Sequence, residues 1–294
     1  MTSLDSGEAS DLFRRDPEQF IDVGAGEVAY RRVGTGPDVL FVHGWPVSGA
    51  TWRTVLPFVA EHVACHVIDL PGAGSSRFDP SRHEISFDQH IETVRRVINA
   101  LDVDDIAVVG HDSGGMIVGH AVAGHGKVRA VGLVDTEQLR LGWRFKSFLV
   151  ARHLPGFAAS LRATMKSKRI RRQPLVLGGV FEDRSLLDGE FDEFFLRPIV
   201  ESDDRLAAAV QLLDSFESRH VDELEHVHSR LDLPVQLVWG VDDPFFPVAW
   251  AQQMVPSFRN AQLTVVNNAR LFSHEERPAE VATALLPTLL GERT

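Results

Sequence analysis

The sequence has little of several features that mark other classes of protein. A single cysteine, Cys65, stands among its 294 residues, so no intramolecular disulfide can form, and the apolar run "VACHVIDL" around it predicts a buried thiol. No apolar run approaches the roughly 20 residues that a membrane-spanning helix needs. No group of cysteines and histidines has the spacing of a zinc site. We therefore expect neither a membrane segment nor a structural zinc ion.

The excess of acidic residues limits the kind of partner. The 30 lysines and arginines face 41 aspartates and glutamates, and the net charge of −11 argues against nucleic acid or an anionic membrane as partner. The first residues, MTSLDSGEASDLFRR, lack the basic and apolar regions of a secretion signal. We expect a cytoplasmic protein, either monomeric or homodimeric, that acts on a small molecule.

Short runs rich in β-branched residues alternate with amphipathic segments. Strands are predicted at "VAYRRV", "DVLFVHG", "CHVIDL", "IAVVGHD", "AVGLVD", "PVQLVWG" and "QLTVVNN", whereas "FDQHIETVRRVINALDV" has apolar residues at helical spacing. This alternation predicts an α/β fold with a mostly parallel sheet flanked by helices. Residues 138–228 contain no comparable strand, and they predict a helical cap inserted between strands, with residues 1–137 and 229–294 as the core.

The stretch "VVGHDSGGMIVGH" at residues 108–120 predicts a strand, a sharp turn and a helix, with Asp112 at the tip of the turn. Gly110 and Gly114 stand two residues before and two after Asp112, where such a turn needs small residues. Ser113 as the tip residue would put His111 at the first of these positions, which is sterically poor. The simpler alternative is that Asp112 only N-caps the following helix.

Two loops after predicted strands add further polar groups. The segment "WGVDDPFFP" at 239–247 ends a strand with an acidic pair, and "LFSHEERP" at 271–278 places His274 after the last strand. The order is nucleophile, acid, histidine, which is the chain order of the α/β-hydrolase triad.

The chain resembles the α/β-hydrolase family over most of residues 25–290. Within that family it is most similar to the branch with an aspartate nucleophile, which contains epoxide hydrolases and haloalkane dehalogenases. The motifs "HGWP", "DLPGAGSS", "GHDSGG" and "WGVDDPFFP…SHEERP" carry the resemblance. It implies that the backbone N–H groups of Trp45 and Ser113 form an oxyanion hole beside the catalytic Asp112.

The resemblance also implies the other members of the triad. The family's acid commonly precedes a proline, as Asp243 precedes Pro244, although the adjacent Asp242 remains an alternative. A further alternative is Asp135, at the end of "AVGLVD", where some dehalogenases carry their acid. His274 would be the base that this acid orients.

A carboxylate suits attack on saturated carbon, because it is already ionised at neutral pH. Attack by Asp112 on an epoxide or on a carbon bonded to halogen would form an alkyl ester. His274 would then take a proton from the water that hydrolyses this ester. We expect this chemistry to need no metal and no organic cofactor.

The residues that would stabilise a leaving group are incomplete for either substrate. Family epoxide hydrolases usually carry two cap tyrosines, whereas the one tyrosine here, Tyr30, lies outside the predicted cap. The plausible neutral donors of similar reach in the predicted cap are Trp143, His153 and His220. Dehalogenases commonly hold the halide with a tryptophan directly after the nucleophile, where this chain has a serine, so that Trp45 is the remaining donor.

We expect an epoxide hydrolase that forms vicinal diols, because "HGWP" and "GHDSGG" look closest to that group. The alternative is a haloalkane dehalogenase, which begins with the same displacement by Asp112. Further alternatives are a carboxylesterase or lactonase that uses Ser113, and a ligand-binding relative without catalytic activity.

Overall fold

The computed structural model describes residues 4–24, 26–79 and 84–292. Its strands form one sheet in the order β1-β2-β4-β3-β5-β6-β7-β8, in which β2 pairs antiparallel with both β1 and β4 and all other pairs are parallel. The strands are β1 (Gln19–Asp22), β2 (Glu27–Val33), β3 (Asp38–Val42), β4 (Ala64–Asp69), β5 (Ile106–His111), β6 (Val128–Val134), β7 (Val235–Gly240) and β8 (Ala261–Val266). The predicted α/β fold with a mostly parallel sheet is confirmed.

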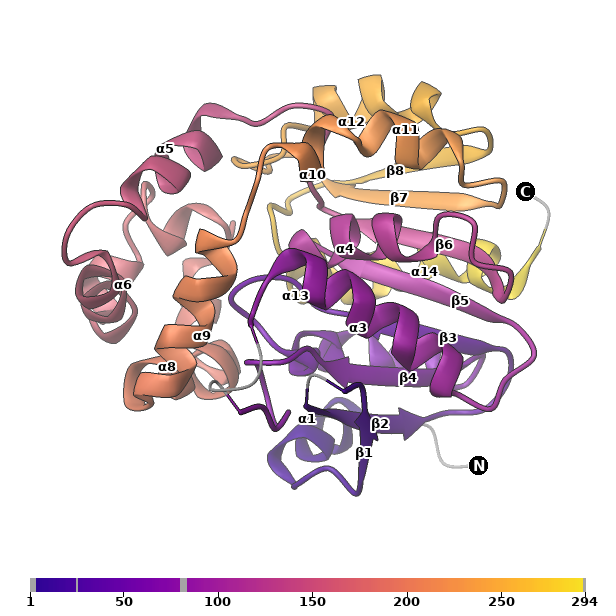
Figure 1. Ribbon diagram of the computed structural model, residues 1–294, viewed down its shortest axis with the longest axis horizontal. Coiled ribbons are helices and arrows are strands. Elements are labelled where there is room, and N and C mark those ends of the chain that lie inside the picture. Colours follow the sequence, from indigo (N-terminus) through magenta and orange to yellow (C-terminus); the bar gives the residue numbers. More distant parts are fainter. Residues whose placement is uncertain (1–3, 25, 80–83, 293–294) are drawn as a thin grey trace.

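Helices cover both faces of this sheet (Figure 1). One face carries α3 (Phe87–Ala100), α4 (Ser113–Val122), α10 (Arg219–Asp222), α11 (Leu224–Ser229), α12 (Val248–Met254) and the turn η5 (Val255–Ser257). The other face carries α1 (Ser6–Arg14), η1 (Gly49–Thr54), α2 (Leu56–Val59), α13 (Ser273–Glu276) and α14 (Pro278–Leu290). The sheet is thus the middle of three layers.

The strand sequences explain why both faces are covered. Side chains alternate between the faces of a strand, so in β3 Leu40 and Val42 enter one apolar core whereas Val39 and Phe41 enter the other. All four are fully buried. Because both faces are buried, these strands read as continuous apolar runs rather than as alternating ones.

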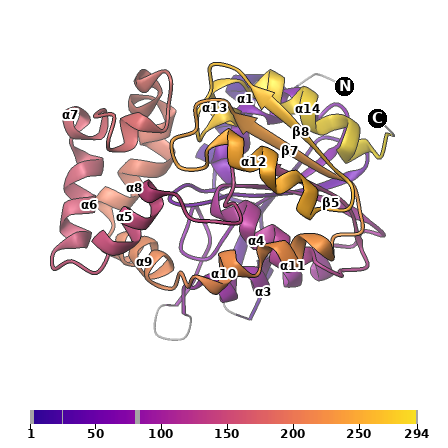
Figure 2. The ribbon, with the colours of Figure 1, turned by 90° about the horizontal axis from the view of Figure 1, so that it is seen from above.

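The chain between β6 and β7 forms only helices and turns. Beyond one end of the sheet lie α5 (Trp143–Ala151), α6 (Phe157–Lys166), α7 (Lys168–Arg171), η2 (Leu177–Gly179), η3 (Arg184–Asp188), the π-helical η4 (Asp192–Leu196), α8 (Arg197–Glu201) and α9 (Asp203–Asp214) (Figure 2). Helices α10 and α11 return along the core, where α11 packs against α4. That residues 138–228 act together as a cap stays a prediction.

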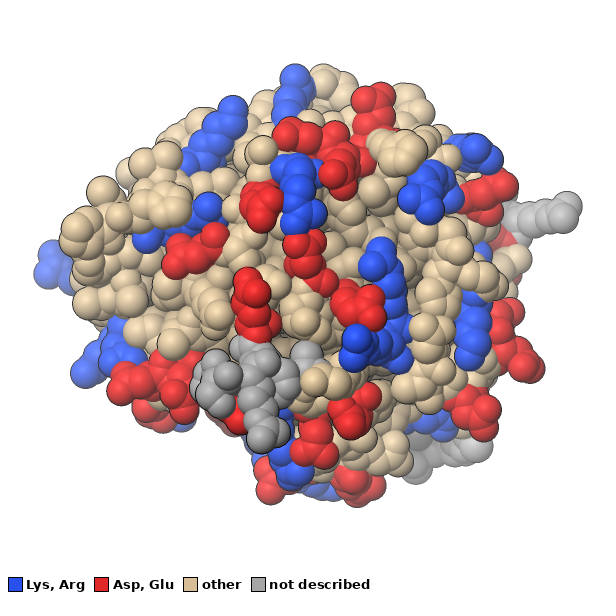
Figure 3. Space-filling model, in the orientation of Figure 1, with Lys and Arg blue, Asp and Glu red and all other residues tan. Residues whose placement is uncertain are grey.

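Two expectations from composition can be compared with the structure. Cys65 is buried on β4, and this burial raises the pKa of its thiol to about 12, so the predicted buried thiol is confirmed. Acidic and basic side chains are interspersed over the face shown in Figure 3. Within the described residues, no helix is long and apolar enough to cross a membrane.

Candidate active site

Asp112 occupies the strained turn that the sequence predicted. Its backbone has φ 51° and ψ −136°, between the end of β5 and the start of α4. A Cβ atom at Gly110 would lie 2.5 Å from the backbone oxygen of Gly114, and one at Gly114 would lie 2.3 Å from that of His43. The turn therefore requires glycine at both positions. The Asp112 side chain makes no capping hydrogen bond to α4, so the alternative of a simple N-cap is wrong.

Backbone N–H groups hold the Asp112 carboxylate. The N–H of Trp45 donates to Asp112 Oδ2 at 2.9 Å, and the N–H of Ser113 also stabilises the charged form. Burial is the larger effect and raises the pKa of Asp112 to about 6. The carboxylate is therefore mostly ionised at neutral pH, and its Oδ2 occupies the donor pair that an oxyanion hole would supply.

A cavity of about 280 Å³ opens at Asp112. It lies between the elbow and the helices α5 and α6, and most of its lining is apolar and aromatic, including Phe145, Phe148 and Phe157. Its polar lining residues are Asp112, Ser113, Glu137, Ser160 and Thr164. Among the described residues that line it, none is a tyrosine, histidine, lysine or arginine. The cavity suits a small apolar molecule.

Glu137 is a candidate that the sequence interpretation missed. It follows β6 by three residues, is 3% exposed and lines the cavity together with Asp112. Burial raises the pKa of Glu137 well above its usual value, and the charge of Asp112 raises it further. A signal was present, because acidic residues just beyond the carboxyl end of a parallel strand lie where α/β proteins bind ligands.

The structure does not bring His274 together with Asp112. The Nε2 atom of His274 lies 2.7 Å from Thr51 Oγ1, and the ring packs against His111 and Trp52 with centroids 4.2 and 5.0 Å away. His274 is fully buried and does not line the cavity. The arrangement therefore gives no support to its expected role as the base.

Other residues of the same loop face the cavity in its place. Leu271 and Phe272 line it, and the short helix α13 begins directly afterwards at Ser273. The side chain of His274 lies away from the cavity, against Thr51, Trp52 and His111. A histidine that served Asp112 from this loop would have to stand at position 271 or 272.

Both carboxylate oxygens of Asp135 accept hydrogen bonds from neighbouring segments of the core. Its Oδ1 accepts the N–H of Gly240 at 2.6 Å, and its Oδ2 accepts the N–H of Ser273 at 3.3 Å and the Ser273 hydroxyl. These bonds tie the end of β6 to β7 and α13. Burial, followed by the nearby charge of Asp243, raises the pKa of Asp135 well above its usual value. Asp135 makes no hydrogen bond to a histidine within the described chain.

Asp243, the preferred acid of the predicted triad, is also buried without a histidine partner. Its Oδ1 accepts the N–H groups of Phe245 at 2.8 Å and Phe246 at 3.0 Å. Its Oδ2 has no hydrogen-bond partner in the described part of the chain. Burial raises the pKa of Asp243 to about 8, and the charge of Asp112 adds to this rise. The neighbouring Asp242 is exposed, which removes it from the site.

These acids do not form a metal centre in the structure. Within residues 4–24, 26–79 and 84–292, no group of three or more His, Cys, Asp or Glu side chains could hold a metal ion.

The expected donors in the helical segment do not reach the cavity. Trp143 is 67% exposed, His153 accepts a hydrogen bond from Arg152, and His220 lies near Asp88. None of these three candidates lines the cavity, so the arrangement gives no support to their expected role in substrate binding, which stays a prediction.

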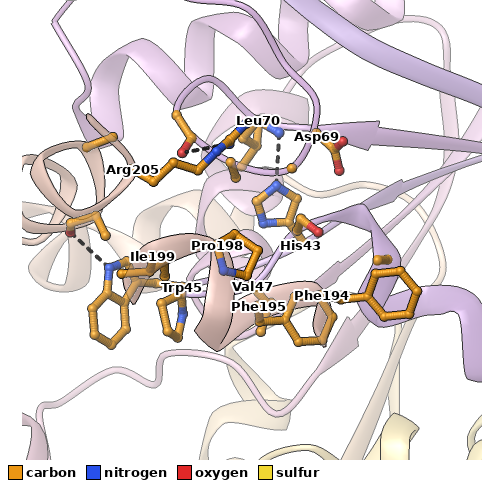
Figure 4. A pocket seen from close by; sticks show the side chains of 18 of the residues that line it. His43, Trp45, Val47, Asp69, Leu70, Phe194, Phe195, Pro198, Ile199 and Arg205 are labelled. Carbon is orange, nitrogen blue, oxygen red and sulfur yellow. Dashed lines mark hydrogen bonds between the residues drawn. The ribbon is translucent and has the colours of Figure 1, made fainter. Parts of the chain in front are cut away.

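Trp45 does line the cavity, but its indole N–H is already engaged. Nε1 of Trp45 donates to the backbone oxygen of Ala209 on α9 at 2.9 Å, as the dashed line in Figure 4 shows. The donor expected to hold a halide is therefore occupied. Its bond instead joins the loop that follows β3 to the helical segment.

A second cavity, of about 470 Å³, shares Trp45, Pro46 and Ser113 with the first. Figure 4 shows its lining, in which Arg205 from α9 points toward Leu70 and the chain around it. The guanidinium of Arg205 reaches the backbone oxygen of Gly72 at 3.5 Å. The loop that holds Asp112 Oδ2 thus borders both cavities.

The chain is similar to three curated relatives that are named as enzymes. It is 26% identical to a pimeloyl-[acyl-carrier protein] methyl ester esterase of Chromobacterium violaceum, over 83% of this chain and 92% of the esterase. It is 34% identical to a soluble epoxide hydrolase of Corynebacterium over 30% of each chain. It is 33% identical to a haloalkane dehalogenase of Mesorhizobium japonicum over 39% of this chain and 36% of the dehalogenase. These relatives have different activities.

A solved structure and a family model agree on the fold. The epoxide hydrolase CorEH superposes with a TM-score of 0.77 at 19% identity, over 94% of this chain and 99% of that one. The model of the alpha/beta hydrolase family matches residues 39–284, which include most of β3, the elbow, the helical segment and α13. The chain therefore belongs to the alpha/beta hydrolase family.

Proposed function

We propose that the protein is an epoxide hydrolase that opens small apolar epoxides through an alkyl ester on Asp112. The observation that carries the proposal is an ionisable carboxylate at a strained elbow, fixed at 2.9 Å by the N–H of Trp45 and facing an apolar cavity. Attack of this carboxylate on an epoxide carbon forms a carbon–oxygen bond and breaks one bond of the ring. Water then hydrolyses the ester and releases a vicinal diol.

The same donors serve both steps. In the ester, the carbonyl oxygen of Asp112 accepts the N–H groups of Trp45 and Ser113, and these groups stabilise the negative charge that develops when water attacks. Because the donors are backbone groups of the turn and its neighbouring loop, they need no rearrangement between the steps.

Ester hydrolysis by Ser113 is less well supported. An acyl-transfer serine needs a base within hydrogen-bond reach, usually histidine. No histidine of the described chain hydrogen-bonds to Ser113, and no described histidine lines the cavity that contains Asp112. The similarity to a bacterial ester esterase nevertheless makes esters a necessary part of the substrate panel.

Dehalogenation is the second candidate, since the relatives include a haloalkane dehalogenase and the first step is the same. A departing halide needs N–H donors near the reacting carbon. Trp45 Nε1 donates to Ala209, and residue 113 is a serine rather than a tryptophan. These two features favour epoxides over haloalkanes.

The test is turnover of a panel of aryl and alkyl epoxides, bromoalkanes and esters by wild type, Asp112→Asn and Ser113→Ala. We expect diol formation from epoxides that Asp112→Asn abolishes and Ser113→Ala retains. Loss of ester cleavage in Ser113→Ala, with Asp112→Asn still active, would move the nucleophile to Ser113. No turnover of any class by wild type would contradict the proposed function.

A further inference from the structure

We propose that Glu137 is a catalytic residue that protonates the epoxide oxygen while Asp112 attacks and then accepts a proton from the hydrolytic water. This inference rests on the proposed function. It would supply both of the groups that the site lacks: a donor in place of the cap tyrosines, and a base in place of a histidine near the nucleophile.

Position is the first argument. Glu137 and Asp112 line the same cavity, and they are the two carboxyl groups among its described lining residues. The remaining polar side chains are the hydroxyls of Ser113, Ser160 and Thr164. A hydroxyl can donate a hydrogen bond, but its pKa is too high for it to give up a proton or hold one taken from water. Glu137 is therefore the one lining group besides the nucleophile that can transfer a proton near neutral pH.

The Thr136 hydroxyl lies within hydrogen-bond distance of both the Asp112 backbone and the Glu137 carboxyl group. Its Oγ1 lies 2.8 Å from the backbone oxygen of Asp112 and 3.2 Å from Glu137 Oε2. The hydroxyl has a single proton and can donate to only one of these oxygens, and the shorter distance favours the Asp112 oxygen. A proton on Glu137 turns the second contact into a hydrogen bond as well. The geometry thus fits a neutral Glu137 beside an ionised Asp112.

The electrostatics act in the same direction. Burial raises the pKa of Glu137 well above its usual value, and the charges of Asp112 and Asp243 raise it further. The backbone N–H of Glu137 opposes the rise, as does the Thr136 hydroxyl when its proton points to Glu137 rather than to the Asp112 oxygen. The backbone N–H groups of Ser113 and Trp45 keep the pKa of Asp112 from rising beyond about 6. Two neighbouring carboxyls whose pKa values are driven apart can take the roles of nucleophile and acid at one pH.

The proton transfers balance over one turnover. In the first step Asp112 Oδ bonds to carbon, the ring C–O bond breaks, and the proton of Glu137 moves to the leaving oxygen, which becomes a hydroxyl. In the second step water adds to the ester carbonyl and gives one proton to Glu137. Collapse of the tetrahedral intermediate returns the Asp112 carboxylate, and the departing alkoxide takes the remaining proton of the added water. The sum is epoxide plus water to diol, with Glu137 neutral again.

Glu137→Gln separates the two roles when it is given two electrophiles. A bromoalkane needs no acid, because bromide leaves unprotonated, so we expect Asp112 to be alkylated in the variant at a rate close to that of wild type. The resulting ester lacks its base, and it should accumulate as a mass gain of the alkyl group on Asp112. An epoxide needs the acid, so alkylation should slow by about 100-fold or more. Intact-protein mass spectrometry with peptide mapping measures both.

Matched variants control for indirect effects. Glu225→Gln makes the same change at an exposed position on α11 and should behave as wild type. His274→Gln tests the rival base. If the ester accumulates in His274→Gln and not in Glu137→Gln, the base is His274 and the inference is overturned. Accumulation in Glu137→Gln alone supports it.

A test on the unaltered protein covers the case in which Glu137→Gln does not fold. Alkylation of wild type by an epoxide should fall at high pH as Glu137 loses its proton, whereas alkylation by a bromoalkane should rise with the ionisation of Asp112 and stay high. Identical alkaline profiles for the two electrophiles would contradict a role for Glu137 as acid. If wild type turns over neither electrophile and forms no adduct, the proposed function itself fails. Full epoxide turnover by a folded Glu137→Gln refutes only the role of Glu137.

Discussion

The imidazole Nε2 of His274 lies 2.7 Å from the Thr51 hydroxyl, and the ring is enclosed by His111 and Trp52. Burial lowers the pKa of His274 well below its usual value, so the ring is neutral at physiological pH. These contacts describe a packing residue that joins α13 to η1.

We therefore predict that His274→Gln weakens the fold more than the chemistry. Loss of a buried hydrogen bond and of aromatic packing should lower the free energy of unfolding by about 1–3 kcal/mol, measured by urea denaturation. Epoxide turnover per folded molecule should stay close to that of wild type. A large loss of turnover at full stability would instead restore His274 to the catalytic mechanism.

Leu271→His is predicted to speed ester hydrolysis. Leu271 and Asp112 line the same cavity, so an imidazole at position 271 would lie in the cavity that contains the ester and could take a proton from the attacking water. In Glu137→Gln, where the ester should accumulate, adding Leu271→His should shorten the lifetime of the adduct. Leu271→Asn, of similar size but without a titratable group, is the control. An unchanged lifetime would show that position 271 cannot deliver a base.

Trp45→Phe tests the link between the loop after β3 and α9. The variant loses the hydrogen bond from Nε1 to Ala209 but keeps the backbone N–H that holds Asp112. We expect a loss of about 1 kcal/mol in the free energy of unfolding. The ratio of bromoalkane to epoxide turnover should not change, because the indole N–H does not hold a halide. A selective loss of bromoalkane turnover would assign that donor to the leaving group.

Asp243 should make the fold less stable as the pH rises. Its pKa is raised from an ordinary 3.8 to about 8, so the folded state holds a proton that the unfolded state has lost between these values. The free energy of unfolding therefore falls through this window, with a slope of at most about 1.4 kcal/mol per pH unit from this group.

Asp243→Asn removes this dependence, because an amide does not titrate in this pH range. The fold should be retained, because the amide oxygen still accepts the N–H groups of Phe245 and Phe246. Urea denaturation from pH 5 to pH 9 should give a flatter profile than wild type, while the exposed Asp242→Asn should follow wild type. Parallel profiles for Asp243→Asn and wild type would contradict a neutral Asp243 in the folded state.

The parallel strands could be predicted because burial on both faces leaves an unmistakable apolar run. "DVLFV", "CHVID" and "IAVVGH" all fall inside observed strands, and the glycine spacing around Asp112 predicted the elbow. Strand β1 was missed, since an edge strand with the sequence QFID has no such run. Local pattern is strong where the sheet is buried and weak at its edge.

The site was harder to predict because its geometry depends on rotations within single turns. His274 stands in the expected loop, yet the start of α13 at Ser273 turns it away, and Leu271 takes the position in the cavity. Glu137 lies only two residues beyond Asp135, but the two carboxyl groups have different surroundings. Asp135 hydrogen-bonds to Gly240 and Ser273, whereas Glu137 lines the cavity. Sequence spacing does not distinguish these two directions.

The most direct test of the central claim follows oxygen through a single turnover. Wild-type protein in excess over an epoxide is reacted in water enriched in oxygen-18. The masses of the diol and of the peptide that contains Asp112 are then measured by mass spectrometry. An alkyl ester on Asp112 predicts a diol without label and one heavy oxygen in Asp112, because water attacks the carbonyl carbon and the carboxylate oxygen leaves with the product. A labelled diol with unlabelled Asp112 would mean that water attacks the epoxide directly, and it would contradict the account.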